Sequence, residues 1–288
     1  MKTLAVNGAG MATVDRGSGP PVLLVHGFPL DHSMWDAQIE ALSSRFRVIA
    51  PDLRGFGPVG QPPSAGLQSA QPGAAVPQLV TMDRFADDLA ALLDALGVGQ
   101  RVVLVGLSMG GYIAFAFCRK YAARLRGLIL CDTRAAADAP AAAAARHETA
   151  DRVLREGPAP LADAMLPKLL APQTLAQRPE IVAAVRKVIL ASDRRGIAAA
   201  LRGMAQRPDF TPLLPQITCP TLVLVGQEDG LSTPDSMQAL SRKIPGSQFV
   251  IISNAGHLPP LERPAETTAA IEAFLTGLAQ EDRHSCLS

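Results

Sequence analysis

The chain is poor in aromatic residues and has almost no net charge. The first feature limits what can line a substrate pocket, and the second limits the classes of partner that the chain can bind. Aromatic residues make up 4% of the 288 residues, with a single tryptophan, Trp35. Any substrate pocket is therefore expected to be lined mainly by Leu, Met and Ile. The 27 basic and 26 acidic side chains leave a net charge of +1, so neither nucleic acid nor a membrane surface is the expected partner. We expect a small-molecule substrate.

Cysteine and long hydrophobic runs are also scarce. The four cysteines form no C-x-x-C pair and no zinc-ligand spacing, so neither a disulfide framework nor a metal site is expected. No apolar run reaches the ~18 residues of a membrane span, and the first eight residues are too short and polar for a signal peptide. These observations favour a soluble, cytoplasmic protein, whose oligomeric state the sequence leaves undetermined.

Hydrophobic residues make up 48% of the chain, and many of them form short continuous runs that alternate with helical patterns. Such runs are typical of strands covered on both faces, as in the parallel sheet of an α/β protein. An antiparallel hairpin over 3–14 is expected at the edge of this sheet. The expected strands cover residues 22–25, 46–50, 102–105, 125–131, 221–225 and 248–252.

Two regions interrupt this alternation. Residues 135–215 carry no strand signal, are rich in Ala, Arg and Leu, and have proline or glycine breaks that include Pro167. We interpret them as a helical cap inserted between two strands of a core formed by residues 1–134 and 216–280. Residues 58–80 are rich in Pro, Gly, Gln and Ser, which indicates a flexible loop insertion, and residues 281–288 are expected to form a disordered tail.

A serine lies between glycines where one apolar run meets a helical pattern. The segment 106–111 reads Gly-Leu-Ser-Met-Gly-Gly, follows the predicted strand 102–105 and precedes a predicted helix. This context is typical of a nucleophile elbow, in which a tight turn holds the serine hydroxyl at a helix N-terminus. The turn leaves no room for side chains at Gly106 and Gly110. We therefore predict Ser108 as the nucleophile.

A serine nucleophile needs a base, and the base needs an orienting acid. His257 follows the last predicted strand and is the expected base, whereas His147 and His284 are expected to be solvated. Asp229 follows the preceding strand and is the expected acid, which gives the chain order nucleophile, acid, base. Two other carboxylates are rivals for that role, Glu228 and Asp132.

The oxyanion of an acyl-transfer reaction needs two N–H donors. We expect these from the backbone of Met109 and of Phe28, the latter in the segment His26-Gly27-Phe28-Pro29. His26 is expected to shape this loop from a buried position. The reaction so assembled is acylation and deacylation of Ser108 and calls for no cofactor and no metal.

Taken together, these motifs resemble the α/β-hydrolase superfamily, and most closely its cap-bearing carboxylesterases and 3-oxoadipate enol-lactonase-like hydrolases. The resemblance rests on 26–29 with Trp35, the segment 51–57 (Pro-Asp-Leu-Arg-Gly-Phe-Gly), the elbow, 226–229, and 256–257 with 262–264. It implies a mostly parallel twisted sheet flanked by helices, with a helical cap. It also implies ester hydrolysis through Ser108, His257 and Asp229. The apolar pocket expected from the composition would suit short to medium acyl esters.

Several other functions stay open within this resemblance. Hydrolysis of an enol lactone, hydrolysis of a C–C bond and a perhydrolase side activity all use the same serine triad. Haloalkane dehalogenases and epoxide hydrolases use an aspartate nucleophile, which Ser108 disfavours. A catalytically idle binding module is disfavoured because all three triad residues are present.

Overall fold

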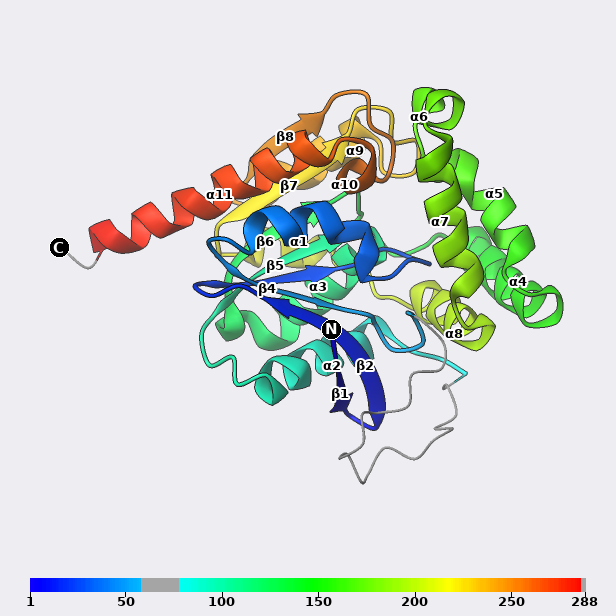
Figure 1. The fold of residues 1–288 in the computed structure, drawn as a ribbon, viewed down its shortest axis with the longest axis horizontal. Helices are drawn as coiled ribbons and strands as arrows, with labels where there is room; N and C mark the ends of the chain where they lie inside the picture. Colours follow the sequence, from blue (N-terminus) through cyan, green and yellow to red (C-terminus); the bar gives the residue numbers. More distant parts are fainter. Residues whose placement is uncertain (58–77, 286–288) are drawn as a thin grey trace.

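A sheet of mixed direction organises the structure, a computed structural model that describes residues 1–57 and 78–285 (Figure 1). Within these residues the sheet has eight strands in the order β1-β2-β4-β3-β5-β6-β7-β8. The first two strands pair antiparallel with each other, β2 pairs antiparallel with β4, and all other pairs are parallel. The strands are β1 (Lys2–Val6), β2 (Ala9–Arg16), β3 (Pro21–Val25), β4 (Arg47–Pro51), β5 (Val102–Leu107), β6 (Leu125–Cys131), β7 (Thr221–Gly226) and β8 (Gln248–Ile252). The predicted edge hairpin and the mostly parallel α/β sheet are thus confirmed.

Helices cover both faces of the sheet (Figure 1). One face carries α1 (Asp36–Leu42) and α11 (Pro264–Ser285), and the other carries α2 (Met82–Ala95), α3 (Met109–Tyr121) and α9 (Pro234–Ser241). The short helices are η1 (His32–Trp35), η2 (Ala122–Arg124), η3 (Thr211–Gln216) and α10 (Pro259–Glu262). None of the described helices is both long enough and apolar enough to cross a membrane.

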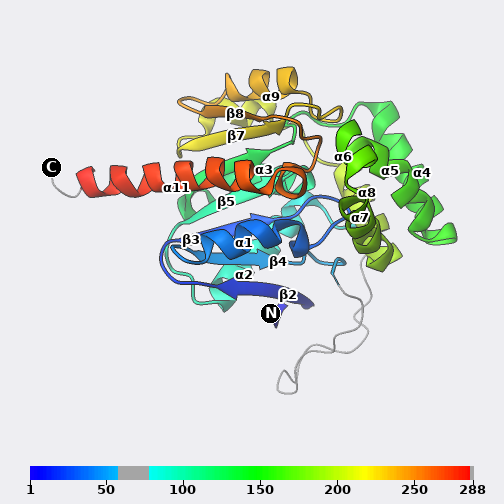
Figure 2. The same ribbon diagram turned by 45° about the horizontal axis from the view of Figure 1, so that its top comes forward.

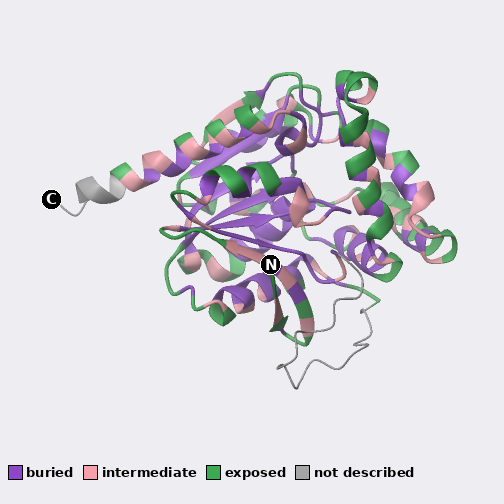
Figure 3. Cartoon of the chain, viewed as in Figure 1, coloured by how far each residue is buried: buried purple, intermediate pink, exposed green. Residues whose placement is uncertain are grey.

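Alternation along the strands divides the buried residues between two cores. In β3, Leu23 and Val25 pack in the core with α2 and α3, whereas Val22 and Leu24 pack in the core with α1 and α11. The strand interior is buried on both faces, as the colouring of Figure 3 shows. Continuous apolar runs such as that of β3 are required by this arrangement, because successive side chains point to opposite faces.

One strand departs from the expectation that all apolar runs are covered on both faces. β8 lies at the edge of the sheet, and of its five residues only Ile252 is buried, while Ile251 is 45% exposed. The expectation was wrong here because apolar composition does not distinguish an edge strand from a central one.

Five α-helices lie between β6 and β7 in the sequence, followed by the short helix η3, and we call the five α-helices the cap helices. They gather beyond the end of the sheet at which the parallel strands end, at the right of Figure 2. Pro167 was expected to break a helix but lies within α5, in its last turn. The cap helices are α4 (Pro140–Glu156), α5 (Ala159–Leu169), α6 (Pro172–Gln177), α7 (Pro179–Ala191) and α8 (Arg194–Ala205).

The predicted cap, loop and tail can each be compared with the elements of the structure. A helical insertion between two strands agrees with the elements found over 135–215, although the division into domains stays a prediction. Most of the loop proposed for 58–80 lies outside the described residues. In the expected disordered tail, residues 281–285 continue helix α11, and residues 286–288 are not described.

Two glycines let α8 lie directly against the core. Gly196 and Gly203 are two helical turns apart, and a Cβ atom would clash with the carbonyl of Gly55 at the first and of Val80 at the second. The Val80 N–H also donates to the carbonyl of Ala199, at 3.2 Å. Close backbone contact at this helix therefore fixes one side of the cap on the core.

We expect Gly203→Ala to lower the free energy of unfolding by about 1–3 kcal/mol, because the added methyl group overlaps a backbone that cannot easily retreat. Gly277→Ala is the matched control: it is also in a helix, but its Cβ would meet no atom within 4 Å. Alanine has the higher helix propensity, so this control should be neutral or stabilising by up to about 1 kcal/mol. Urea unfolding of both variants measures the difference, and equal stability of the two would contradict the close packing of α8.

Candidate active site

Ser108 lies in the turn between β5 and α3, at the edge where the parallel strands end. Its backbone has φ +55° and ψ −111°, a strained conformation for a residue with a side chain. A Cβ at Gly106 would clash with the backbone of Gly110, and a Cβ at Gly110 would clash with the carbonyl of Val25. The turn is therefore as tight as predicted, and it leaves Ser108 partly exposed while its neighbours are buried.

His257 and Asp229 come together on the loops that follow β8 and β7. The Nδ1 atom of His257 lies 2.7 Å from Oδ2 of Asp229, and both side chains are buried. With Nδ1 held by the carboxylate, the other ring nitrogen of His257 is left to act as a base. Ser108 and His257 line the same cavity, so the structure brings all three predicted residues to one place.

The environment of Asp229 favours its ionised form. Burial by itself would raise the pKa of this carboxyl group. The hydrogen bond and charge of His257, with the N–H groups of Ser232 and Leu231, outweigh burial, and the pKa is lowered. The Leu231 N–H donates to Oδ1 at 2.7 Å. Asp229 is therefore an anion that can stabilise a protonated His257.

Two backbone N–H groups beside Ser108 are available to a ligand. Those of Phe28 and Met109 take no hydrogen-bond partner among the described residues. Met109 is the first residue of α3, where the unpaired N–H groups of a helix favour negative charge. Phe28 follows Gly27, where a Cβ would lie 3.4 Å from the Cβ of Ser108. Both N–H groups therefore lie beside the nucleophile candidate.

His26 shapes the loop that carries Phe28, as expected. It is fully buried, its Nδ1 lies 2.9 Å from the carbonyl of Gly27, and its Nε2 accepts the N–H of Leu53 at 3.0 Å. Because one ring nitrogen accepts and the other faces a carbonyl, the ring is the neutral Nδ1–H tautomer. Burial lowers the pKa of His26, which agrees with a neutral structural role.

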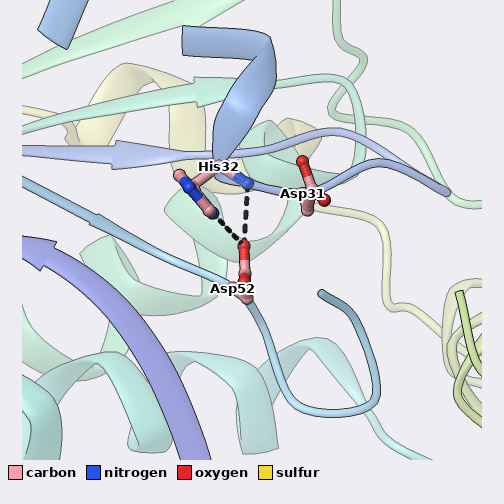
Figure 4. A group of neighbouring side chains, drawn as sticks. All are labelled: Asp31, His32 and Asp52. Atoms are coloured by element: carbon pink, nitrogen blue, oxygen red, sulfur yellow. Dashed lines mark hydrogen bonds and ion pairs between the residues drawn. The ribbon is translucent and has the colours of Figure 1, made fainter. Parts of the chain in front are cut away.

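A second histidine, which the sequence did not single out, anchors the same loop. The backbone N–H of His32 and its Nδ1 both contact Oδ1 of Asp52, at 2.9 and 2.6 Å (Figure 4). Asp52 is buried just after β4. Asp31 lies beside them and accepts both the N–H and the hydroxyl of Ser33. The hydrogen bond to Asp52 raises the pKa of His32, and this ion pair ties the Phe28 loop to the neighbouring strand.

The rivals for the acid role occupy different positions. Glu228 is exposed and makes no hydrogen bond with His257 within the described part of the chain. Asp132 is fully buried, and one of its oxygen atoms lies within 4.8 Å of a carboxylate oxygen of Asp229 and of a ring nitrogen of His257. Asp132 is therefore close to the site although Asp229 makes the hydrogen bond to the histidine.

Glu262 fixes the loop of His257 against the cap. Its carboxylate is buried and accepts the N–H groups of Gly256 and Ala171, each at 2.8 Å, and the hydroxyl of Thr174 at 2.6 Å. The N–H of His257 in turn donates to the carbonyl of Leu169 at 3.0 Å. The histidine loop and cap helices α5 and α6 therefore share one hydrogen-bonded network.

The cavity above Ser108 has a volume of about 440 Å³ and lies between the core and the cap. Among the apolar cap side chains, Met165, Leu169 and Met204 line it, whereas Leu166 and Ile189 are buried elsewhere in the cap. Basic side chains line it as well: Arg134, Arg146, Arg152 and Lys168. A ligand here would meet an apolar wall and several cations.

Two groups of described residues place potential metal ligands close together. They are Asp31 with His32 and Asp52, and Asp132 with Asp229 and His257. In both groups a histidine ring nitrogen is within hydrogen-bond distance of a carboxylate, at 2.6 and 2.7 Å. These distances fit a hydrogen bond directly between the two side chains. The second carboxylate oxygen of Asp52 and that of Asp132 are buried and take no hydrogen-bond partner among the described residues.

A family model described as "alpha/beta hydrolase fold" matches residues 20–264. Among solved structures, an esterase from Thermogutta terrifontis with malate bound is 50% identical, with a TM-score of 0.88 over 96% of this chain and 98% of that one. The enol-lactonase from Burkholderia xenovorans LB400 is 29% identical, with a TM-score of 0.81 over 95% and 99%.

The curated relatives are either less similar in sequence to this chain or match only part of it. The 3-oxoadipate enol-lactonase 2 of Acinetobacter baylyi is 26% identical over 92% of this chain and 91% of its own. Epoxide hydrolase 2 of Siraitia grosvenorii is 41% identical, but the matched stretch covers 44% of this chain and only 36% of that protein.

The pKa of His32 predicts how stability depends on pH. A raised pKa in the folded protein means that the ion pair with Asp52 stabilises fully below the unfolded pKa of about 6.5. This stabilisation disappears as pH rises through the higher folded pKa. His32→Ala should therefore cost about 2 kcal/mol in the free energy of unfolding at low pH, and clearly less near pH 9.

Denaturant unfolding at several pH values measures this gap between wild type and variant. His147→Ala is the matched control, since His147 is exposed on α4 and should show no such trend. A gap for His32→Ala that stays constant across the pH range would contradict the ion pair.

Proposed function

Because this chain belongs to the α/β-hydrolase family, we propose that this hydrolase cleaves carboxylic esters through Ser108, His257 and Asp229. The observation that carries the proposal is the position of His257. Its ring is held at Nδ1 by Asp229, 2.7 Å away, and it shares a cavity with Ser108, which stands in a strained turn at the start of α3. A nucleophile, an oriented base and a buried anion form the arrangement that acyl transfer requires.

The proposed reaction begins with attack by the Ser108 hydroxyl on the ester carbonyl carbon. His257 accepts the hydroxyl proton through Nε2, and Asp229 stabilises the imidazolium that forms. The carbonyl oxygen becomes an oxyanion that accepts hydrogen bonds from the N–H groups of Phe28 and Met109. Removing one such donor costs roughly 3 kcal/mol of transition-state stabilisation in enzymes of this kind.

Collapse of the tetrahedral intermediate expels the alcohol, which takes the proton from His257. Water then enters, His257 removes one of its protons, and the resulting hydroxide attacks the acyl carbon. A second tetrahedral intermediate releases the carboxylic acid and returns the proton to Ser108. Every proton in this cycle moves through His257, so the reaction needs only side chains and backbone groups of this chain.

The cavity supports short to medium acyl groups as substrates. At about 440 Å³ it lies within the usual range of small-molecule sites, and its apolar wall is formed by Met165, Leu169 and other cap side chains. The malate-bound esterase that is 50% identical to this chain supports the ester class as well. These two observations favour ester hydrolysis over hydrolysis of a C–C bond and over a perhydrolase activity, both of which use the same three residues.

A second candidate is hydrolysis of an enol lactone or another ester that carries a carboxylate. The enol-lactonase relatives support it, and so does the charge of the cavity. Arg146 is paired with Asp138 at 2.5 Å, and Arg152 is 3.6 Å from Glu156. Lys168 lines the cavity and has no anionic partner among the described residues. Arg134 has no anionic partner among these residues either, but its guanidinium donates to the carbonyl of Leu231. Lys168 is therefore the less restrained of the two unpaired cations that a substrate carboxylate could meet.

We expect Ser108→Ala and His257→Ala each to lower kcat/KM for p-nitrophenyl butyrate by about 10⁴-fold or more. The double variant should be no slower than either single one, because the two residues act as a unit. Ser236→Ala is the matched control, with an exposed serine on α9. Steady-state kinetics on purified variants checks this, and ester hydrolysis that survives Ser108→Ala unchanged would overturn the proposal.

Lys168→Gln separates the two candidate substrate classes. If the substrate carries a carboxylate, KM for a half-ester of a dicarboxylic acid should rise about two- to fivefold, because an exposed ion pair is worth up to about 1 kcal/mol. KM for the neutral butyrate ester should stay the same. Lys187→Gln is the matched control, since Lys187 is exposed on α7 and lines none of the described cavities. Equal KM values for the half-ester in all three proteins would exclude Lys168 as a carboxylate contact.

A further inference from the structure

Asp132 is a buried carboxyl group at the end of β6, next to the acid of the proposed triad. It has φ +45°, a left-handed conformation that aspartate tolerates better than most residues, and it is fully buried. Its Oδ1 accepts the N–H of Gly226 from β7 at 2.8 Å, and its own N–H donates to Leu224 at 3.0 Å. Both backbone contacts hold the carboxyl group beside the loop that carries Asp229.

The second oxygen of Asp132 has an unusual environment. Oδ2 is buried, and it has no hydrogen-bond partner among the described residues. No lysine or arginine forms a salt bridge with Asp132 in the described chain. What faces this carboxyl group instead is Asp229 together with His257: one oxygen of Asp132, one oxygen of Asp229 and one ring nitrogen of His257 all lie within 4.8 Å of one another. The carboxyl group of Glu262 adds a further acid nearby.

Two buried carboxyl groups in contact do not ionise together, because each negative charge disfavours the other. Burial above all, and then the charge of Asp229, raises the pKa of Asp132 well above its ordinary value. The pKa of Asp229 is lowered, since His257 and two backbone N–H groups stabilise its charge. Of the two carboxyl groups, Asp132 therefore holds a proton more readily than Asp229.

We propose that Asp132 is a neutral carboxylic acid whose Oδ2–H donates a hydrogen bond to the carboxylate of Asp229, and that it thereby positions the acid of the triad. This inference rests on the proposed function for its kinetic consequences, but the proton itself does not depend on the reaction. Asp132 keeps its proton throughout the cycle, so it is a positioning residue that acts through Asp229.

The proposal explains how Asp229 is held. The Leu231 N–H donates to Oδ1 and the Nδ1–H of His257 to Oδ2, while the O–H of Asp132 approaches from the neighbouring strand. Donors on several sides fix the rotation of the carboxylate about its side-chain bonds. A fixed carboxylate keeps the His257 ring in the orientation that a base toward Ser108 requires.

The first test is infrared spectroscopy of the intact protein near pH 7. Wild type should show the C=O band of a buried, protonated carboxylic acid, and Asp132→Asn should lack that band. Asp209→Asn, which removes an exposed carboxyl group, is the matched control and should keep it. A wild-type spectrum without the band would overturn the proposal, whether or not the protein hydrolyses esters. The same band in Asp132→Asn would overturn it too.

The second test compares pH profiles of kcat/KM. Asp132→Ala should lower kcat about ten- to a hundredfold with little change in KM, because a hydrogen bond to a charged group is lost. Asp132→Asn, whose amide N–H can still donate to Asp229, should recover most of that loss. If Asp132 is neutral, the acid limb set by His257 stays at the same pH in Asp132→Asn.

Two kinetic outcomes would contradict the proposal. If Asp132 were ionised, replacing it with asparagine would remove a negative charge near His257, and the acid limb would move to lower pH by more than half a unit. If Asp132→Asn were as slow as Asp229→Asn, Asp132 would itself be the acid. Should Ser108→Ala leave ester hydrolysis intact, the proposed function fails, and the infrared result alone then decides the protonation of Asp132.

Discussion

The shared direction of the parallel strands is the constraint on which the site depends. β3, β5, β6, β7 and β8 run side by side, so the loops that follow them leave the same edge of the sheet. Phe28, Ser108, Asp132, Asp229 and His257 each lie on one of those loops. Phe28, Ser108 and His257, which are separated by up to 229 positions in the chain, therefore line one cavity, and Asp229 contacts His257. A register shift of any of these strands would move one component of the site away from the others.

Contacts between the cap helices and the core also hold this arrangement together. Glu262 accepts hydrogen bonds from both the His257 loop and cap helix α6, and Gly196 and Gly203 let α8 approach the core backbone. The cap therefore does more than cover the cavity, because it shares hydrogen bonds with the segment that carries His257. Polar groups buried at this junction are costly when unpaired, so the network favours one relative position of cap and histidine loop.

The strand positions and the meeting of Ser108, Asp229 and His257 followed from the sequence, because apolar runs and turn glycines report local constraints. Contacts between distant residues were less visible. Nothing in the segment around His32 indicates that Asp52 lies beside it, and the neighbours of Asp132 do not reveal a second carboxyl group facing it. The exposure of β8 was also missed, because edge position depends on the order of strands in space and not on composition.

We propose that Ser108 is activated by His257 and Asp229, and mass spectrometry after treatment with a serine-reactive fluorophosphonate tests this activation most directly. We expect one adduct per chain, on the peptide that contains Ser108, and much slower labelling in His257→Ala. An adduct on another residue, or no adduct on a protein that hydrolyses esters, would contradict it.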